Sequence, residues 1–216
     1  KKILYCKYQD AKPNKLLKQT NMKKSLLFVS TFFVLLIYSC KKDENPTDAN
    51  NNSNNPMSCN GQTTFTDPRD GQTYDIVRIG NQCWFAENLN YTTGNSWCYD
   101  NDTVNCNTYG RLYDWQTALI ACPSGWHLPS DAEWKILTDS LFGENVAGGR
   151  MKTTTGWNAT NTGATNSSGF SGLPGGFRNE NGVFLDVGEY GFWWSSTDEG
   201  IFASWLRELN YNSSSV

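Results

Sequence analysis

The single histidine is the first residue whose type suggests chemistry. His127 stands in "CPSGWHLPSDAEWKIL", directly ahead of a helix that begins with a capping pattern. A metal ligand, a general base and a structural plug are its three candidate roles, and the first two need convergent partner residues. We interpret His127 as structural: it orients the turn before Ser130 by hydrogen bonding a backbone group, with Trp126 and Leu128 alternating into and out of the core.

No other residues form an evident catalytic or metal-binding set. A nucleophilic Cys–His pair would have to be Cys122 and His127, and both stand in a turn with Pro123, Gly125 and Pro129. The sequence has no Cys-x₂-Cys knuckle for zinc. The acidic loop at 100–105 offers oxygen ligands for Ca²⁺ but lacks the bidentate Glu and the spacing of a known loop. G-x-S-x-G, H-E-x-x-H and phosphate-loop motifs are missing from the sequence. We predict no catalytic residue, no metal and no cofactor.

The cysteines suggest disulfides instead. Seven cysteines occur, at positions 6, 40, 59, 83, 98, 106 and 122. Cys98 and Cys106 bracket a short loop of turn-forming residues, so we predict a disulfide between them in an oxidising compartment. Cys59 and Cys83 flank a probable strand pair and are the second candidate bridge, with two buried thiols as the alternative. Cys122 is predicted to be unpaired.

The first part of the chain has the pattern of an export signal. From Met22, "MKKSLLFVSTFFVLLIYSC" has a basic start and an apolar run that is too short to span a bilayer comfortably, which needs about 20 residues. We therefore predict a signal peptide over 22–39, with an N-terminal membrane helix as the alternative. Residues 1–21 show neither an amphipathic pattern nor turn signals, and we interpret them as unstructured upstream translation.

The residues "IYSC" resemble the lipobox of bacterial lipoproteins, although Tyr38 is bulkier than usual. This resemblance implies that Cys40 becomes a lipidated N-terminus that holds the protein at a membrane. "KKDEN" after Cys40 is similar to the export tag of surface lipoproteins in Bacteroidetes-type bacteria, which implies the outer face of the outer membrane. Residues 40–57 are polar and rich in Asn, typical of a disordered tether, and 58–216 is predicted to be one domain.

Charge argues against nucleic acid as a partner. Residues 41–216 carry ten Lys and Arg against twenty Asp and Glu, whereas residues 1–40 carry eight Lys and one acid. Binding of nucleic acid needs a basic face. We predict no nucleic-acid partner.

The periodicity of the domain indicates strands, helices and then strands again. Residues 71–85 predict two strands with a turn at Gly80-Asn81. Leu112, Trp115, Leu119 and Cys122 have the spacing of one apolar helix face, which Pro123 ends.

A second helix is predicted after Pro129. Ser130 and Glu133 form a capping box, in which the serine oxygen and the glutamate carboxylate each satisfy a free backbone N–H. Trp134, Leu137 and Leu141 form its buried stripe.

The rest of the domain is predicted to be long loops and strands. The chain is dense in Gly, Asn, Ser and Thr from residue 148 onwards. Asn181-Gly182 indicates a two-residue hairpin turn, and "YGFWWSST" and "ASWLREL" indicate two further strands, whose Trp193, Trp194 and Trp205 we assign to the core. The class is therefore α+β.

Five motifs in the same order resemble one family: "DGQTYDIVRIGNQCWFAENLNY", "WCYDNDTVNCNTYGRLYDWQTA", "CPSGWHLPSDAEW", "GFSGLPGGFRNENGVF" and "GFWWSST". They are similar to the Fibrobacter succinogenes major paralogous domain, from about Phe65 onwards. The resemblance implies a fold like that of C-type lectins and formylglycine-generating enzymes, with two helices, a mixed twisted sheet and long loops. It also implies a closing strand with a Cys near the terminus, which would be the partner of Cys122, so we expect a chain truncated before that strand.

The resemblance implies a surface binding module with a glycan or protein ligand. The signatures of calcium-dependent sugar binding are missing, so lectin activity rests on analogy alone. An enzyme related to formylglycine-generating oxidases is the alternative, disfavoured because that chemistry uses cysteines near the C-terminal end and residues 123–216 contain none.

Substitution of Cys40 tests the predicted anchor. Cys40→Ser is expected to abolish lipidation and release the protein from membrane fractions, because the acyl chains have no other attachment site. Fractionation with mass measurement gives the answer. Membrane retention of the unprocessed variant would favour a transmembrane helix instead.

Overall fold

The computed structural model describes residues 1–8, 59–198, 200 and 204–216. Residues 1–8 belong to the same structural unit as the described residues from Cys59 onwards. The predicted signal peptide, the lipidation site Cys40 and the tether up to residue 57 lie outside these described residues. Within the described part of the chain, none of the helices is long and apolar enough to cross a membrane.

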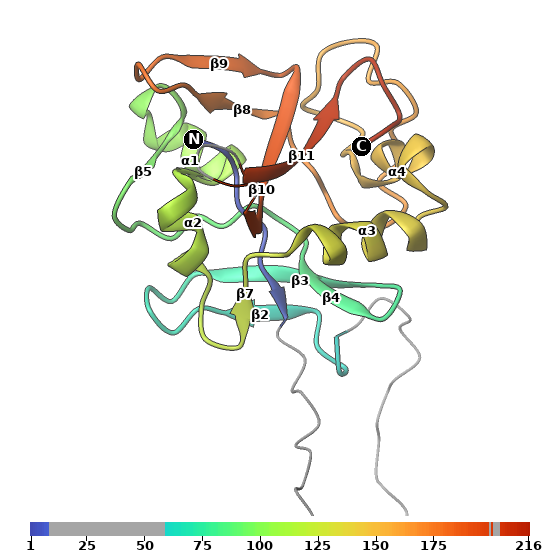
Figure 1. Ribbon diagram of the computed structural model, residues 1–216, viewed down its shortest axis with the longest axis horizontal. Coiled ribbons are helices and arrows are strands. Elements are labelled where there is room, and N and C mark those ends of the chain that lie inside the picture. Colours follow the sequence, from blue (N-terminus) through green and yellow to red (C-terminus); the bar gives the residue numbers. More distant parts are fainter. Residues whose placement is uncertain (9–58, 199, 201–203) are drawn as a thin grey trace, which may run out of the picture. The chain divides into compact units, whose positions relative to one another are not determined.

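The described residues form an α+β structure, as predicted, but with four α-helices instead of two. The helical elements are η1 (Tyr99–Asn101), α1 (Thr103–Tyr109), α2 (Trp115–Ala121), α3 (Asp131–Ser140) and α4 (Glu144–Met151). The strands are β1 (Lys7–Tyr8), β2 (Thr64–Thr66), β3 (Thr73–Ile79), β4 (Gln82–Phe85), β5 (Ser96–Trp97), β6 (Leu112–Tyr113), β7 (Trp126–His127), β8 (Gly175–Arg178), β9 (Phe184–Val187), β10 (Tyr190–Asp198) and β11 (Ser204–Asn210). They make sheets of order β2-β3-β4-β1-β7, β11-β10-β8-β9 and β5-β6 (Figure 1). Pairing is antiparallel except between β8 and β10.

The N-terminal segment is part of the core. β1 lies between β4 and β7 and is antiparallel to both, with Lys7 opposite Trp84 on one side and His127 on the other. Ile3, like the three residues that follow it, is almost fully buried. The prediction of an unstructured segment is therefore wrong for residues 1–8, while 9–21 lie outside the described residues. A strand that is buried on both faces shows no polar alternation, so its pattern is easily missed.

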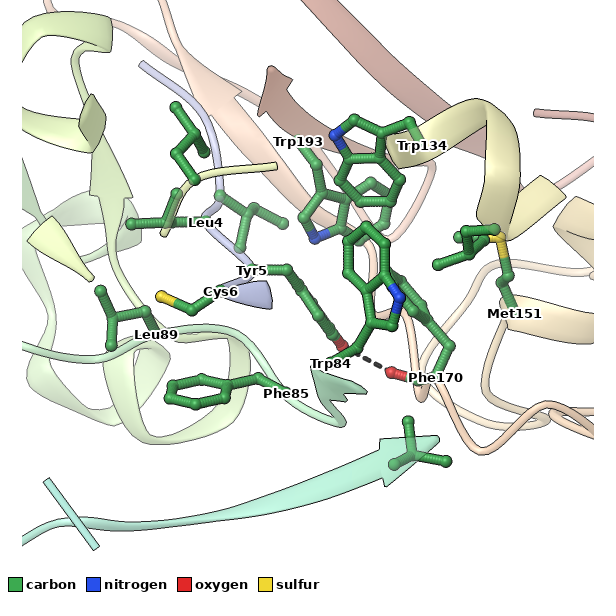
Figure 2. Close-up of a cluster of buried hydrophobic side chains, with 14 of the residues drawn as sticks. Leu4, Tyr5, Cys6, Trp84, Phe85, Leu89, Trp134, Met151, Phe170 and Trp193 are labelled. Atoms are coloured by element: carbon green, nitrogen blue, oxygen red, sulfur yellow. Dashed lines mark hydrogen bonds between the residues drawn. The ribbon is translucent and has the colours of Figure 1, made fainter. Parts of the chain in front are cut away.

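Five aromatic rings from distant parts of the chain form the centre of the core (Figure 2). The Tyr5 ring stacks on Phe170 with ring centroids 4.2 Å apart, and its hydroxyl donates to the Phe170 carbonyl at 2.8 Å. Trp84 and Trp134 pack at 4.9 Å, and Trp193 meets Phe170 edge to face at 6.0 Å. The assignment of Trp134 and Trp193 to the core is confirmed.

The helix that follows the Trp-His-Leu-Pro turn has the predicted N-terminus. In α3 the Ser130 hydroxyl accepts from the Glu133 N–H, and the Glu133 carboxylate accepts from the Ser130 N–H at 2.8 Å. Trp134, Leu137 and Leu141 are buried as predicted. The capping box and the apolar stripe are therefore confirmed.

The preceding helix buries a different face from the predicted one. α2 begins after Asp114, whose carboxylate accepts from the Thr117 N–H at 2.8 Å. Its buried residues are Thr117, Ala118 and Ala121, whereas Leu119 is exposed. The predicted apolar face is therefore wrong. The residues that α2 buries have small side chains, which allow neighbouring elements to pack close to the helix.

Two helices were missed for different reasons. α1 lies in the loop that Cys98–Cys106 closes and is capped by Asp102, whose carboxylate accepts from the Val104 N–H at 2.9 Å. α4 contains Gly148 and Gly149, which resemble loop residues in sequence. A Cβ at Gly149 would lie 2.4 Å from the Gly163 carbonyl oxygen, so close backbone packing requires glycine here.

The hairpin of β8 and β9 is present, but its turn is longer than predicted. The Asn179 N–H donates to the Val183 carbonyl at 2.9 Å, which leaves a three-residue loop. Of the predicted pair, Gly182 has positive φ and Asn181 does not. This matches a three-residue connection with glycine in the left-handed position, so the two-residue turn is wrong.

A buried lysine fixes the Gly- and Asn-rich loops after α4. The Lys152 ammonium donates to the carbonyls of Thr162, Asn210 and Ser213 at 2.8–3.0 Å. Burial lowers the pKa of Lys152 to about 8. Three carbonyls thus satisfy a desolvated cation and join the loops to the C-terminal residues.

The tryptophans of the last two strands differ in exposure. Trp193 is buried and Trp194 is half-buried, with its indole N–H donating to the Tyr113 carbonyl at 2.9 Å. Trp205 is 43% exposed, so its assignment to the core is wrong. It lies on β11, an edge strand of its sheet.

Two tyrosines of the N-terminal segment provide a matched test of its burial. Tyr5→Ala is expected to lower the free energy of unfolding by about 4 kcal/mol, since it leaves a cavity and removes a buried hydrogen bond. Tyr8→Ala, at a side chain that is 37% exposed, is expected to cost about 1 kcal/mol or less. Urea denaturation of both variants measures the difference. Equal midpoints would contradict the insertion of residues 1–8.

Candidate functional site

A polar cleft lies beside the Cys98–Cys106 disulfide. Its walls come from the turn between β2 and β3, from residues 87–92 after β4, and from α1 with the start of β6. These segments are separated in sequence, and each is held by its own set of hydrogen bonds.

A buried carboxylate fixes the β2–β3 turn. Asp67 is fully buried and accepts from the Arg69 guanidinium through both oxygens, at 2.6–3.1 Å. Burial favours the neutral acid, but the hydrogen bonds from Arg69 prevail and lower the pKa of Asp67. The Arg69 guanidinium also stacks on Tyr91, 3.7 Å from the ring centroid. This cation–π contact ties the turn to the segment after β4.

Asn88 forms the floor of the cleft. Its amide nitrogen donates to the Tyr109 carbonyl at 2.6 Å, and its amide oxygen accepts from the buried Trp193 indole at 3.0 Å. A Cβ at Gly110 would lie 2.6 Å from the Asn88 Cβ, and Gly110 has a φ of +73°. Glycine is therefore required where α1 meets the floor.

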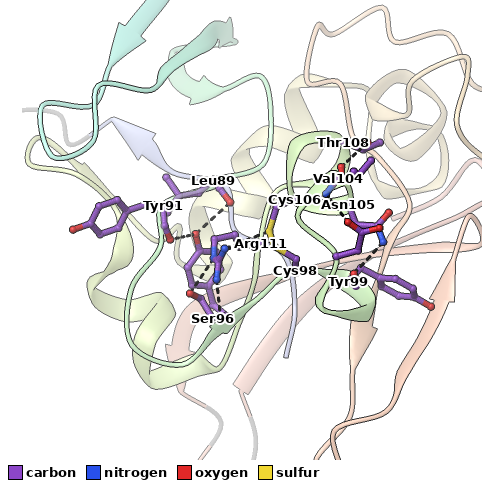
Figure 3. Close-up of a disulfide and its surroundings, with 12 residues drawn as sticks. Leu89, Tyr91, Ser96, Cys98, Tyr99, Val104, Asn105, Cys106, Thr108 and Arg111 are labelled. Atoms are coloured by element: carbon purple, nitrogen blue, oxygen red, sulfur yellow. Dashed lines mark hydrogen bonds between the residues drawn. A yellow bond between two sulfur atoms is a disulfide. The ribbon is translucent and has the colours of Figure 1, made fainter.

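The disulfide and an arginine fix the α1 side of the cleft. Figure 3 shows the Arg111 guanidinium between Ser96 and the Cys98–Cys106 bridge. It donates to the Ser96 hydroxyl and carbonyl at 3.1 and 3.0 Å and lies 3.4–3.5 Å from both sulfurs. The predicted Cys98–Cys106 pair is thus present and borders the cleft.

The cleft consists of two adjoining cavities of about 240 and 450 Å³, of which the larger is the more open. Both are lined by Gln72, Asn90, Asn107 and the disulfide-bonded Cys106. Within the described residues, these three amides form no side-chain hydrogen bond to the protein. Each offers a donor and an acceptor to a ligand.

Two carboxylates complete the lining. Asp70 lines the larger cavity, and its carboxylate accepts from the Gln72 N–H at 3.0 Å. Glu87 lines the smaller cavity and accepts from the Asp75 N–H at 2.6 Å. Burial raises the pKa of Glu87. Amides, hydroxyls and carboxylates in this arrangement suit a ligand with several hydroxyl groups, each of which both donates and accepts.

The structure places no evident metal centre at this cleft. Over the described ranges, no group of three or more His, Cys, Asp and Glu side chains is positioned to hold a metal ion. Residues of the loop 100–105 have structural contacts instead. Asp102 caps α1, and the Asn105 amide donates to the Tyr99 carbonyl at 3.0 Å.

His127 lies elsewhere, in a charged cluster at β1, β7 and α3. Its Nε2 lies 3.0 Å from one Glu133 oxygen and 3.1 Å from the other. The Lys7 ammonium is 3.3 Å from the same carboxylate. We predicted that His127 would hydrogen bond a backbone group. In the structure its partner is the Glu133 side chain instead.

The residues flanking His127 also differ from the prediction. Trp126 and Leu128 are both buried, so they do not alternate into and out of the core. Pro129 is buried as well, and its carbonyl accepts from the Ser196 N–H at 2.8 Å. The turn is therefore fixed on β10 and not by the histidine alone.

The prediction that Cys122 is unpaired is wrong. Cys122 forms a disulfide with Cys6, at a sequence separation of 116. Cys59–Cys83 is present as predicted. The expectation of a closing strand rests on the family resemblance and stays a prediction. Only the burial of the N-terminal segment brings Cys6 to Cys122.

Comparison with known families gives a match to the Fibrobacter succinogenes major domain over residues 77–215. The chain belongs to this family. The matched range contains α1, the segment after β4 and the Trp-His-Leu-Pro turn. The β2–β3 turn and the segment Lys1–Tyr8 lie outside the match to the family. No match was found among curated proteins or among solved structures.

Sequence reasoning missed the cleft of this family member. Gln72, Asn90 and Asn107 lie in two of the stretches that carry the family resemblance, residues 70–91 and 97–118, but single amides have no sequence signature. The predicted Cys98–Cys106 disulfide was the one sequence feature that pointed to this region. The bridge closes the loop and thereby positions Asn107 next to the other two walls of the cleft. The loop was interpreted as solvated turns, and α1 within it was not foreseen.

The Glu133 carboxylate should make stability depend on acidic pH. Burial favours its neutral form, but hydrogen bonds from His127 and Ser130 outweigh this effect and lower the pKa of Glu133 from 4.5 to about 2. The contribution is present above pH 4.5 and is lost as the pH falls towards 2, with a total of about 3 kcal/mol. Glu133→Gln should flatten this part of the stability curve in urea titrations. Glu180→Gln, at an exposed turn, serves as control, and identical curves for all three proteins would contradict the assignment.

Proposed function

We propose that this domain is a non-catalytic binding module and that the cleft beside Cys98–Cys106 binds a carbohydrate. The observation that carries the proposal is the set of three amides, Gln72, Asn90 and Asn107, that line the cavities without a side-chain hydrogen bond inside the described structure. Groups held without an internal partner retain their full capacity for a ligand.

The lining favours a glycan over an apolar or anionic ligand. Amide and hydroxyl groups predominate, and Asp70 and Glu87 disfavour anions. Tyr109 is the one aromatic residue among those that line the smaller cavity. A sugar presents vicinal hydroxyls to such groups and C–H faces to a ring. A protein ligand with exposed polar side chains is the competing outcome.

The walls are rigid, which supports binding. Asp67–Arg69, Asn88 and the Cys98–Cys106 bridge each fix one wall through buried or partly buried contacts. A ligand therefore loses little free energy to ordering the protein. A likeness of the whole domain to C-type lectins is part of the same proposal, and it rests on the sequence motifs and the α+β architecture.

The absence of chemistry is part of the proposal too. All six cysteines among the described residues are in disulfides, which leaves no thiolate there for an oxidase-type reaction. The pair of Cys122 and His127 is not a nucleophile and base, since Cys122 is bridged and His127 contacts Glu133. An enzyme of the formylglycine-generating type has no observation in its favour.

We further propose that the domain is displayed on the outer membrane by a lipid on Cys40, supported by the sequence of residues 22–40. Three disulfides fit an oxidising compartment. Cleavage before Cys40 would separate residues 1–39 from the domain, so Lys1–Tyr8 would lie in the core only of the uncleaved chain.

Binding assays with cleft variants test the carbohydrate proposal. A glycan array followed by calorimetry, with and without Ca²⁺, should find binding that does not depend on the ion. Gln72→Ala with Asn90→Ala should weaken it about thirtyfold, because two hydrogen bonds of about 1 kcal/mol each are lost. Asn145→Ala, at an exposed site on α4, should leave affinity unchanged. If no glycan on the array binds, the proposal of a carbohydrate ligand is wrong. If Asn145→Ala weakens binding as much as the double variant does, the binding site is not this cleft.

A further inference from the structure

We propose that the smaller cavity of the cleft binds a sugar ring that carries a free amine, and that the Glu87 carboxylate recognises its ammonium group. The ligand is then a glycan that ends in an amino sugar whose amine is not acetylated. This inference rests on the proposed carbohydrate function of the cleft and names the class of sugar within it.

The smaller cavity contains a carboxylate without a counter-ion. Glu87 is the one charged residue among the described residues that line this cavity. In the part of the chain that the structure describes, its side chain forms no ion pair, and its Oε1 accepts one hydrogen bond, from the Asp75 N–H at 2.6 Å. Its Oε2 therefore retains its capacity to accept from a ligand.

The surroundings of Glu87 disfavour its negative charge. Burial is the largest cause that raises the pKa of Glu87, and the nearby Asp75 carboxylate adds to it, although the hydrogen bond from the Asp75 N–H opposes both. A desolvated carboxylate of this kind is stabilised when a cation binds beside it. A ligand ammonium supplies that charge, whereas a hydroxyl group does not.

The arginine of the cleft does not compensate Glu87. Arg111 lines the larger cavity but not the smaller one. Its guanidinium donates to Ser96 and lies against the Cys98–Cys106 sulfurs (Figure 3). The larger cavity thus has Arg111 together with Asp70, while the smaller cavity has a carboxylate alone. Charge therefore directs a cationic ring to the smaller cavity.

The other polar groups of the smaller cavity suit an ammonium, which has three N–H donors and no acceptor. The side-chain oxygens of Gln72, Asn90 and Asn107 are acceptors that have no side-chain partner among the described residues. The Thr108 hydroxyl donates to the Val104 carbonyl at 3.1 Å, so its oxygen can accept as well. Acetylation of the amine removes its charge and two of its three donors, and it adds bulk.

The sizes of the two cavities place the amino sugar at the end of a glycan. The smaller cavity, of about 240 Å³, lies below the range of about 300–1,000 Å³ that is usual for drug-sized ligands. It therefore suits one ring and not a whole oligosaccharide. The adjoining cavity of about 450 Å³ is more open and offers space for the rings that follow.

Two tetrasaccharides that differ in one acetyl group test the inference. The first is a tetramer of N-acetylglucosamine, and the second is the same tetramer with a free amine on its non-reducing terminal ring. Calorimetry at about pH 6, where a primary amine is a cation, measures both affinities. The protein should bind the free-amine form about tenfold more tightly, because charge-assisted hydrogen bonds are stronger than neutral ones.

Glu87→Gln should reduce this tenfold preference to less than twofold. The variant keeps a side-chain oxygen for the Asp75 N–H but removes the charge. Glu180→Gln is the matched control, because it changes the net charge equally at an exposed turn, and it should keep the tenfold preference. An equal loss in Glu180→Gln would indicate general attraction to an acidic protein and would overturn the inference.

The two proposals fail in different ways. Equal binding of the two tetramers by the unaltered protein would overturn the amino-sugar inference and leave the carbohydrate function in place. Binding of other glycans on the array but of neither tetramer would have the same meaning. An array on which no glycan binds would overturn the carbohydrate function and this inference with it.

Discussion

The burial of Lys1–Tyr8, whose last two residues form β1 between β4 and β7, is the constraint on which the rest of the described structure depends. The segment passes from the Lys2 pairing with Tyr113, past Phe192 of β10, to β1 in the five-stranded sheet. It therefore contacts elements of all three sheets. Its Tyr5 side chain enters the aromatic core, where Phe170 of the Gly-rich region, Trp134 of α3 and Trp84 of β4 meet. Removal of this strand would leave the backbone groups of β4 and β7 without partners, and such buried groups are costly.

The core and the cleft are linked through Asn88, whose side-chain amide has a hydrogen-bond partner in each. Asn88 accepts from the buried Trp193 indole and donates to the Tyr109 carbonyl at the cleft, so packing in the interior sets the positions of polar groups at the surface. The groups that build the walls are satisfied internally, whereas the three cleft amides have no internal side-chain partner among the described residues. The binding role that we propose for the cleft rests on this division between residues that support the walls and amides that have no internal partner. The family match covers most of the cleft but not the β2–β3 turn, which contributes Asp70, Gly71 and Gln72.

What the sequence by itself determined was local. The Ser130–Glu133 box, the Cys98–Cys106 bridge and the β3–β4 hairpin all join residues a few positions apart, so backbone geometry and residue type were sufficient. The α+β class followed from the order of these elements. The face of α2, the helix α4 and the three-residue turn at Gly182 depended on what packs nearby. The sequence shows that Leu119 is apolar and that Gly149 is flexible. It does not show which elements pack beside them, and this packing determines whether Leu119 is buried and whether Gly149 lies in a helix.

The features that only tertiary structure decided join residues that are far apart in the chain. Cys6 reaches Cys122 across a separation of 116, and His127 and Lys7 come to one carboxylate from different strands. The cleft amides come from three segments whose proximity depends on Asn88 and Gly110. The segment Lys1–Tyr8 was predicted to be unstructured because its residues 3–7 are all buried. A strand that is buried on both faces lacks the alternation of apolar and polar residues that marks a strand in the sequence. The physical reason is the same in each case: these contacts gain free energy only after the chain has closed long loops, and local residue patterns carry no record of that closure.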